Sequence, residues 1–364
     1  MPAHCLSLAL HETYMHRCLQ LARLGSTRVA PNPMVGAVLV HDDRIIGEGY
    51  HAYFGGPHAE VACLQNVQEK DKSLIAASTL YVSLEPCTHF GKTPPCADLI
   101  LEQGIQRVVI GCRDPFYQVA GRGIEKLKAA GIEVSVGVLQ QECEALNHLF
   151  FTYHNQHRPY IILKWAQSGD GKIAAHNRRT YISSKATNRL VHRWRSEVAS
   201  ILVGTNTALF DDPSLTTRLA PGANPLRLVI DRMLRLPVGL TLFNGEHKTV
   251  VFNLLQQKEY VNLTHYRLEG DKPIVAQLVK ALAGMQVQSL LVEGGAYTLQ
   301  AFIDAGYWDE ARIITNERLF IGKGIAAPGL KDGRPVAQEA IDGDRIRYFK
   351  NPAAGTEPSL TPSL

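Results

Sequence analysis

Apolar and polar positions along the first 150 residues follow patterns that predict helices alternating with strands. Over 11–24 the apolar residues recur at helical spacing, and the pattern stops at Gly25, a residue common just after a helix. Pro57 suits the first turn of another helix, because the missing N–H of proline costs nothing there. Strands are predicted at 34–40, 45–50, 79–84, 108–111 and 132–136, and further helices at 97–103, between the last two strands, and at 139–150. This order is typical of an α/β domain whose sheet is covered on both faces.

A second α/β pattern follows a polar stretch that ends in Pro159. We place a linker at 151–159, between a domain at 1–150 and a second domain at 160–350. The segment 351–364 is rich in Pro, Ser and Thr, and we expect it to form a loose tail. In the second domain, strands are predicted at 160–165, 200–203, 226–230, 249–252, 289–292 and 311–315, and helices at 185–197, 274–283 and 297–305.

Composition and charge exclude several classes of protein. The chain has 364 residues, which suggests two domains at about 150 residues each. With 45% hydrophobic and 20% charged residues it can bury a full core, so a mainly disordered protein is excluded. A net charge of +4 is too small to indicate nucleic acid or an anionic membrane as partner. The apolar runs are much shorter than the roughly 20 residues of a spanning helix, and no basic region precedes the short apolar N-terminus, so we expect a cytoplasmic protein.

The clearest candidate for chemistry is His58-Ala59-Glu60, followed later by Cys87 and Cys96. One imidazole and two thiolates leave a fourth position open on zinc, as catalytic zinc sites require. Glu60, close to them but not a ligand, can then move protons. Zinc nucleobase deaminases carry His-x-Glu followed by Pro-Cys-x-x-Cys, whereas eight residues separate the two cysteines here. The alternative for Cys87 and Cys96 is a pair of buried thiols.

The long insert between the cysteines identifies a family. Residues 85–96 read Glu-Pro-Cys-Thr-His-Phe-Gly-Lys-Thr-Pro-Pro-Cys, and this run resembles the bifunctional riboflavin-biosynthesis deaminase–reductases. Further segments similar to that family lie at 31–36, 47–51, 57–60 and 114–123. The resemblance implies a cytidine-deaminase-like three-layer α/β/α domain that deaminates a diaminopyrimidinone ribotide. By the same resemblance His58, Cys87 and Cys96 bind Zn²⁺, Glu60 is the catalytic proton shuttle, Asn32 and His51 contact substrate, and Lys92 is a candidate for the substrate phosphate.

The second domain resembles the reductase half of the same family, which has a dihydrofolate-reductase-like α/β fold. The similar segments lie at 163–172, 182–184, 203–207, 211–218 and 292–295. The resemblance implies that NADPH reduces the ribosyl group of the substrate to ribityl. The substrate-binding positions that it implies are Lys164, Arg195, Arg218 and Glu293. The cofactor-binding positions are Ala166, Tyr181, Thr207, Asp211, Gly294 and Gly295.

One segment departs from the family pattern, and two other functions stay open. The serine with which the family usually contacts its ligand cannot be placed at 176–181. The choice of NADPH over NADH therefore rests on the resemblance alone. Arg178 and Arg179 are candidates for binding the 2′-phosphate of NADPH. One alternative is a deaminase of free or RNA-borne nucleobases with a degenerate reductase half. Another is an RNA-binding module with a structural zinc, although such sites use four protein ligands. The leading prediction is a homo-oligomeric enzyme that acts on a small molecule, with no nucleic acid or membrane partner.

Overall fold

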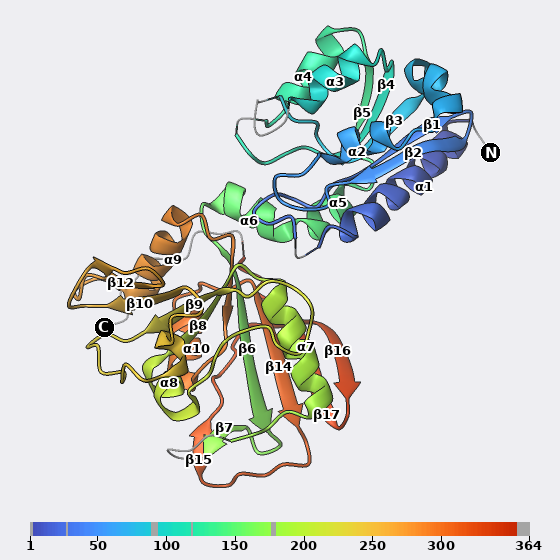
Figure 1. Ribbon diagram of the computed structural model, residues 1–364. Helices are drawn as coiled ribbons and strands as arrows, with labels where there is room; N and C mark the ends of the chain where they lie inside the picture. Colours follow the sequence, from blue (N-terminus) through green and yellow to red (C-terminus); the bar gives the residue numbers. More distant parts are fainter. Residues whose placement is uncertain (1–2, 27, 89–93, 118, 176–179, 355–364) are drawn as a thin grey trace. The chain divides into compact units, whose positions relative to one another are not determined.

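The computed structural model describes residues 3–26, 28–88, 94–117, 119–175 and 180–354 (Figure 1). The chain divides into two compact units, Met1–Asn155 and Gln156–Leu364. Within the described part of the chain, no helix combines the length and the apolar character needed to cross a membrane. Most of the predicted tail at 351–364 lies outside the described residues.

The first unit is built around one mixed sheet. Its strands are β1 Gly36–His41, β2 Arg44–Tyr50, β3 Thr79–Leu84, β4 Arg107–Cys112 and β5 Glu133–Val136. They lie in the order β2-β1-β3-β4-β5, and β1 is antiparallel to both of its neighbours. β3, β4 and β5 run parallel to one another. The five strands predicted for this half of the chain are confirmed.

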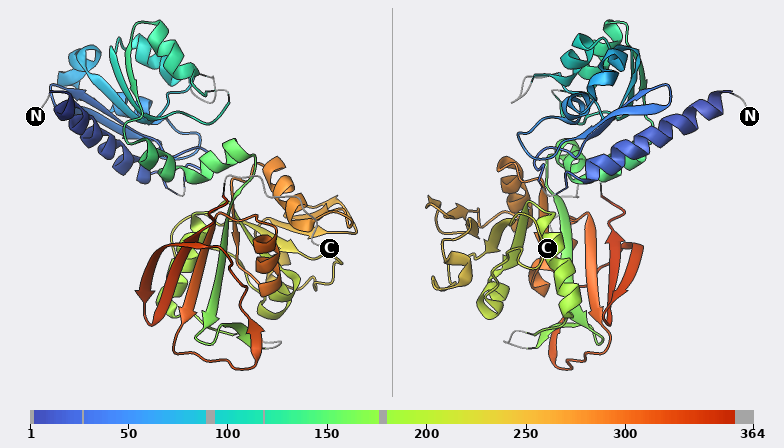
Figure 2. Two further views of the ribbon diagram at one scale, coloured as in Figure 1. Left: turned by 180° about the vertical axis from the view of Figure 1, so that it is seen from behind. Right: turned by 45° about the vertical axis from the view of Figure 1, so that its right-hand side comes forward.

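Helices cover both faces of this sheet (Figures 1 and 2). They are α1 Ala3–Arg23, α2 Ala59–Gln65, the short 3₁₀ helix η1 Glu69–Ala77, α3 Cys96–Glu102, α4 Arg122–Ala129, α5 Gln140–Leu146 and α6 His148–Gln156. Side chains alternate along β1, so that Ala37 and Leu39 pack in one core with α2, α3 and α4. Val38 and Val40 face the other core, with α1 and α5. This arrangement confirms the predicted three-layer α/β/α architecture.

Two helices approach the sheet closely where the strands carry glycine. A Cβ atom added at Gly36 would lie 2.0 Å from the carbonyl oxygen of Cys18 in α1. One added at Gly49 would lie 2.2 Å from the backbone nitrogen of Cys63 in α2. Backbone atoms cannot move aside as the end of a flexible side chain can. The positions of α1 and α2 against β1 and β2 therefore depend on the absence of a side chain at these two residues.

The second unit contains a ten-stranded sheet and a separate two-stranded one. The strands of the large sheet, in chain order, are β6 Tyr160–Ser168, β8 Ser200–Gly204, β9 Leu226–Ile230, β10 Thr249–Asn253, β11 Lys258–Glu259, β12 Leu263–Arg267, β13 Ser289–Val292, β14 Glu310–Asn316, β16 Arg334–Ile341 and β17 Asp344–Lys350. Their spatial order is β11-β12-β10-β9-β8-β13-β6-β14-β17-β16, with a parallel centre from β12 to β14 and antiparallel edges. The small sheet pairs β7 Lys172–Ala175 with β15 Gly324–Ala326.

Helices also pack on both faces of the large sheet (Figure 2). They are α7 Lys185–Ser196, α8 Thr205–Asp211, the short 3₁₀ helix η2 Thr241–Phe243, α9 Ile274–Gly284 and α10 Ala296–Asp304. Leu278 of α9 and Phe302 of α10 belong to the main core of the unit, with Leu163 of β6. Trp194 of α7 packs on the opposite face, with Ile314 of β14. The α/β class predicted for this half is confirmed.

Other parts of the predicted pattern need correction. The single helix predicted at 139–150 is wrong, because it is interrupted at the buried residue Asn147 between α5 and α6. The segment 151–159, predicted as a linker, is helical as far as Gln156. Phe150 and His154 are one helical turn apart, and their ring centroids lie 4.3 Å from each other. This contact stabilises the helix although its sequence is polar. The hairpin of β16 and β17 was not predicted, because the side chains of β16 are mostly exposed and give no apolar pattern.

We expect the Gly49→Ala variant to be destabilised by about 3 kcal/mol, because the new methyl group overlaps the backbone of α2. Urea unfolding of the full chain measures the change. Gly284→Ala is the matched control, because an added Cβ at that residue of α9 meets no atom within 4 Å. Equal stability of the two variants would show that α2 can move away from β2 at little cost.

Candidate active sites

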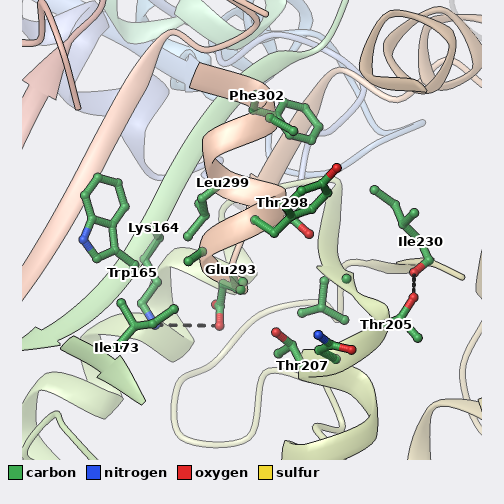
Figure 3. Close-up of a pocket in the computed structure, with 18 of the residues that line it drawn as sticks. Lys164, Trp165, Ile173, Thr205, Thr207, Ile230, Glu293, Thr298, Leu299 and Phe302 are labelled. Carbon is green, nitrogen blue, oxygen red and sulfur yellow. Dashed lines mark hydrogen bonds and ion pairs between the residues drawn. The ribbon is translucent and has the colours of Figure 1, made fainter. Parts of the chain in front are cut away.

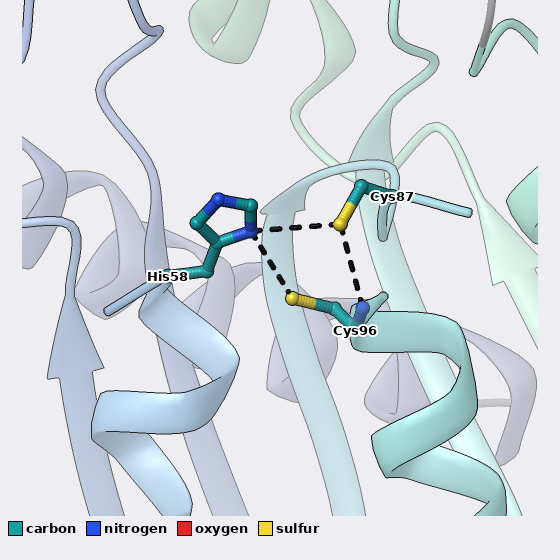
Figure 4. Close-up of side chains that lie close together, drawn as sticks. All are labelled: His58, Cys87 and Cys96. Carbon is teal, nitrogen blue, oxygen red and sulfur yellow. Dashed lines mark hydrogen bonds between the residues drawn. The ribbon is translucent and has the colours of Figure 1, made fainter. Parts of the chain in front are cut away.

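The first candidate site joins three side chains from two helix starts and one loop (Figure 4). His58 is the residue just before α2, Cys87 follows β3 by a short loop, and Cys96 is the first residue of α3. The Nδ1 atom of His58 lies 3.3 Å from Sγ of Cys96 and 3.5 Å from Sγ of Cys87. Among the described residues, this is the one group of His, Cys, Asp or Glu side chains close enough together to hold a metal ion.

The three donor atoms fit a zinc ion. Zinc bonds of about 2.0 Å to nitrogen and about 2.3 Å to sulfur place tetrahedral ligands about 3.5–3.8 Å apart. The separations from His58 come close to that range, and all three ligand atoms lie within 4.8 Å of one another. The structure thus brings together the three ligands predicted from the sequence. Three protein ligands also leave the fourth position of a tetrahedral ion open, as catalytic zinc sites do.

The two thiols differ in acidity. A hydrogen bond from Cys96, helped by His58, lowers the pKa of Cys87 to about 4. The same hydrogen bond and burial raise the pKa of Cys96 well above its usual range. Cys87 is therefore the more acidic of the two thiols. A cation bound by both sulfur atoms would favour the deprotonated form of each thiol.

A buried carboxyl lies beside these ligands. Glu60 is in the first turn of α2 and is only 4% exposed. Burial, and after it the charge of Cys87, raises the pKa of Glu60 to about 7. A carboxyl with such a pKa can both accept and donate a proton near neutral pH. Glu60 thus has the acidity that a proton shuttle requires.

Asn32 and His51 form a polar pair next to the ligand His58. Nδ1 of His51 lies 2.9 Å from the carbonyl oxygen of Pro57, which can only accept, so Nδ1 carries the proton. Nε2 of His51 therefore accepts from the amide of Asn32 at 3.1 Å. Burial lowers the pKa of His51, in keeping with a neutral ring. The ring centroids of His51 and His58 lie 5.6 Å apart, so the pair lies close to the metal ligands.

A second buried carboxylate organises the loop around the site. Glu85, two residues before Cys87, accepts hydrogen bonds from four backbone N–H groups, those of Asp114, Gly121, Gly123 and Ile124, at 2.9–3.3 Å. The segment 114–124 is thereby attached to the segment that carries the cysteine ligand. Lys92, the predicted phosphate contact, lies outside the described residues.

The second candidate site is a cavity of about 1350 Å³ in the second unit (Figure 3). Its wall is formed by β6, the start of α8, the turn between β13 and α10, and the small sheet. Nine of the ten residues predicted for the reductase site line it: Lys164, Ala166, Tyr181, Arg195, Thr207, Asp211, Glu293, Gly294 and Gly295.

The polar centre of this cavity is an ion cluster around Glu293. Its carboxylate accepts from Nε and Nη2 of Arg195 at 2.8 and 2.7 Å, and Nζ of Lys164 lies 3.8 Å away. Burial alone would raise the pKa of Glu293, but the charges of Arg195 and Lys164 outweigh it and hold this pKa at about 2. The carboxylate therefore stays ionised, and it fixes the guanidinium of Arg195 in the wall.

Arg218 is the predicted site residue that the structure places apart. It lines a separate, smaller cavity of about 230 Å³ rather than the large one. Nη1 of Arg218 donates to the hydroxyl of Thr216 at 2.8 Å, and Nη1 of Arg195 donates to the carbonyl of the same residue at 3.2 Å. The two arginines are thus linked through Thr216.

The turn after β13 has the form of a cradle for a large ligand. Added Cβ atoms at Gly294 and Gly295 would lie 3.2 and 3.1 Å from the side chain of Thr207, at the start of α8. The backbone N–H groups at the start of α10 are the kind of donor that binds a pyrophosphate. The observed geometry therefore suits the predicted role of these residues in binding a dinucleotide.

Sequence reasoning missed further cationic residues of the cavity. Arg232 and Arg235 follow β9, and Lys272 precedes α9, and all three line the wall. Their place after a strand of a parallel sheet was a usable signal, because ligands bind at the carboxyl ends of such strands. Arg178 and Arg179, the predicted contacts for a 2′-phosphate, lie outside the described residues.

Comparisons with known proteins match both halves of the chain. Residues 8–112 match the cytidine and deoxycytidylate deaminase zinc-binding region, and residues 159–340 match the RibD C-terminal domain. The riboflavin biosynthesis protein RibD of Aquifex aeolicus is 41% identical over 332 residues, which cover 89% of this chain and 90% of that protein. The RibD protein of Bacillus amyloliquefaciens is 38% identical, with 97% and 96% of the two chains covered.

Solved structures give the same result. A diaminohydroxyphosphoribosylaminopyrimidine deaminase/5-amino-6-(5-phosphoribosylamino)uracil reductase from Thermotoga maritima matches with a TM-score of 0.84 at 38% identity, covering 95% of this chain and 99% of that one. RibD of Acinetobacter baumannii matches with a TM-score of 0.85 at 30% identity, covering 94% and 99%. These findings confirm the resemblance noted in the sequence. The chain therefore belongs to the RibD family of riboflavin biosynthesis proteins, and it carries both a zinc-binding deaminase region and the RibD C-terminal domain.

Proposed function

We propose that this chain catalyses two successive steps of riboflavin biosynthesis. The first unit hydrolyses an amino group from a diaminopyrimidinone ribotide, and the second reduces the ribosyl group of the product to ribityl. The observation that carries this proposal is the presence, in one chain, of a three-ligand metal cluster beside the buried Glu60 and of a large cavity with the ion cluster of Glu293. The Thermotoga maritima relative is named for the same two activities.

In the deaminase half, different residues would bind the metal, transfer protons and orient the substrate. His58, Cys87 and Cys96 would hold Zn²⁺, which supplies a Lewis acid that makes water a nucleophile at neutral pH. Glu60 accepts a proton from the attacking water and gives it to the ring nitrogen. It then takes the second proton, from the newly added hydroxyl group, and gives it to the amino group, which leaves as ammonia. Asn32 and His51 orient the ring of the substrate. The pKa of Glu60, about 7, supports a carboxyl that works in both directions.

In the reductase half, one set of residues would hold the substrate and another would hold the cofactor. Lys164 and Glu293 bind the ribosyl group near its reacting carbon, and Arg195 and Arg218 bind its phosphate. A nicotinamide dinucleotide supplies the hydride. The residues proposed to bind that dinucleotide are Ala166, Tyr181, Thr207, Asp211, Gly294 and Gly295.

The proposed cofactor is NADPH rather than NADH. The two dinucleotides differ by a 2′-phosphate, and a guanidinium can bind two oxygen atoms of a phosphate at once. Arg232 and Arg235 supply two such groups at the wall of the cavity, after the end of β9. A homo-oligomeric state and a cytoplasmic location stay predictions.

Mass spectrometry of the ribotide after incubation with the zinc-loaded chain tests both steps. We expect loss of the amino group without a cofactor, and the ribityl product only when NADPH is added. Deamination alone, even with NADPH, would contradict the reductase half of the proposal. Release of ammonia from cytidine or an RNA stem-loop, with none from the ribotide, would favour a nucleobase deaminase instead.

We expect Glu60→Gln to lower the rate of deamination by about 100- to 10,000-fold, because it removes the group that moves protons. Zinc content should not change, since this residue is not among the three clustered ligands. Reduction of the deaminated ribotide by the same variant is the internal control, because it takes place in the other unit. Near-normal deamination would refute the role of Glu60.

We expect the double variant Arg232→Ala/Arg235→Ala to raise KM for NADPH by about 10- to 100-fold, the value of one or two charge-assisted hydrogen bonds. KM for NADH should stay the same, because NADH has no 2′-phosphate. Arg334→Ala, on the exposed edge strand β16, is the matched control for loss of positive charge. Parallel increases for both dinucleotides would argue against a role in selecting the phosphate.

A further inference from the structure

The break between α5 and α6 is occupied by a buried amide. Asn147 is 4% exposed and follows the last residue of α5. Its Oδ1 accepts a hydrogen bond from the backbone N–H of Met34 at 2.8 Å. Its Nδ2 donates to the carbonyl oxygen of Met34 at 2.9 Å. One side chain thus satisfies both backbone polar groups of a residue that lies 113 positions earlier in the chain.

Met34 ends a segment that has few backbone donors of its own. Pro31 and Pro33 lack an N–H group, and Asn32 between them donates its own to the carbonyl of Val29 at 2.9 Å. Met34 also lies two positions before Gly36, the first residue of β1, so its polar groups are not part of the β1 ladder. The two hydrogen bonds with the Asn147 side chain therefore satisfy the backbone N–H and carbonyl groups that a neighbouring strand would otherwise satisfy.

The segment held by Asn147 leads directly to the polar pair of the deaminase site. Nδ2 of Asn32 contacts Nε2 of His51 at 3.1 Å, and the backbone N–H of His51 donates to Val35 at 3.0 Å. His51 in turn contacts the carbonyl of Pro57, the residue before the metal ligand His58. Displacement of Met34 would therefore displace Asn32 and its contact with His51.

We propose that Asn147 is a positioning residue of the deaminase reaction, acting through Met34 to fix Asn32 where it contacts substrate. This inference rests on the proposed function of the first unit. The hydrogen bonds of the Asn147 amide go to Met34 rather than to the metal ligands or Glu60. Its effect should therefore fall on substrate binding and orientation, and leave the metal in place.

The test uses the full zinc-loaded chain and the variant Asn147→Leu, which has a similar volume and no hydrogen-bonding groups. We expect KM for deamination to rise by about 10- to 100-fold, because a small misplacement of an orienting group has effects of this size. Zinc content and reduction of the deaminated ribotide should match the unaltered chain. Gln106→Leu is the matched control, because this exposed amide bonds only to the nearby Gly104 among the described contacts.

A double-mutant cycle separates positioning from a merely structural role. If Asn147 acts through Asn32, then Asn147→Leu should change KM little in an Asn32→Ala background. Equal effects in the two backgrounds would overturn the proposal, and so would an unchanged KM in Asn147→Leu alone.

A readout without turnover distinguishes failure of this inference from failure of the proposed function. Hydrogen exchange at the backbone N–H groups of Met34 and Val35 should become faster in Asn147→Leu and stay unchanged in Gln106→Leu. An unaltered chain that does not deaminate the ribotide would refute the proposed function. Unchanged exchange in Asn147→Leu would refute the inference whatever the activity.

Discussion

The close approach of α2 to β2 is the contact on which the deaminase site depends. Added Cβ atoms at Gly47 and Gly49 would lie 2.7 and 2.2 Å from backbone atoms of Cys63, so the helix rests directly on the strand. The first turn of α2 carries Glu60, and His58 stands just before it. His58 of the candidate metal cluster and the buried Glu60 are therefore placed by one backbone contact, and the two cysteines complete the cluster from the segment after β3.

The two sites use buried carboxylates in opposite ways. Glu60 and Glu293 are both deeply buried, and burial alone raises the pKa of each. Glu60 has no neighbouring arginine or lysine among the causes of its shift, and its pKa is about 7, which suits proton transfer. Glu293 lies against Arg195 and Lys164, and its pKa is about 2, which keeps a fixed negative charge. The nearby charges, rather than burial, decide which task each carboxylate can perform.

The sequence predicted features that depend on a local motif or a local apolar pattern. It did not predict features that depend on contacts between residues far apart in the chain. The cluster of His58, Cys87 and Cys96 followed from residue type and spacing, and β3 has the bounds expected from its apolar run. The break at Asn147 could not be predicted, because its cause is a pair of hydrogen bonds to a residue 113 positions away. The separate place of Arg218 depends likewise on how the loop after α8 folds.

Thr216 connects an arginine of the large cavity with an arginine of the small one. Its carbonyl accepts from Arg195 in the wall of the large cavity, and its hydroxyl accepts from Arg218 at the smaller one. The Nε and Nη2 atoms of Arg195 are already committed to Glu293, so only part of its guanidinium can face a phosphate. If both arginines bind one phosphate, as proposed, that phosphate would lie near Thr216, which both guanidinium groups contact. Because the carboxylate of Glu293 fixes the orientation of Arg195, it would also set the position of the proposed phosphate.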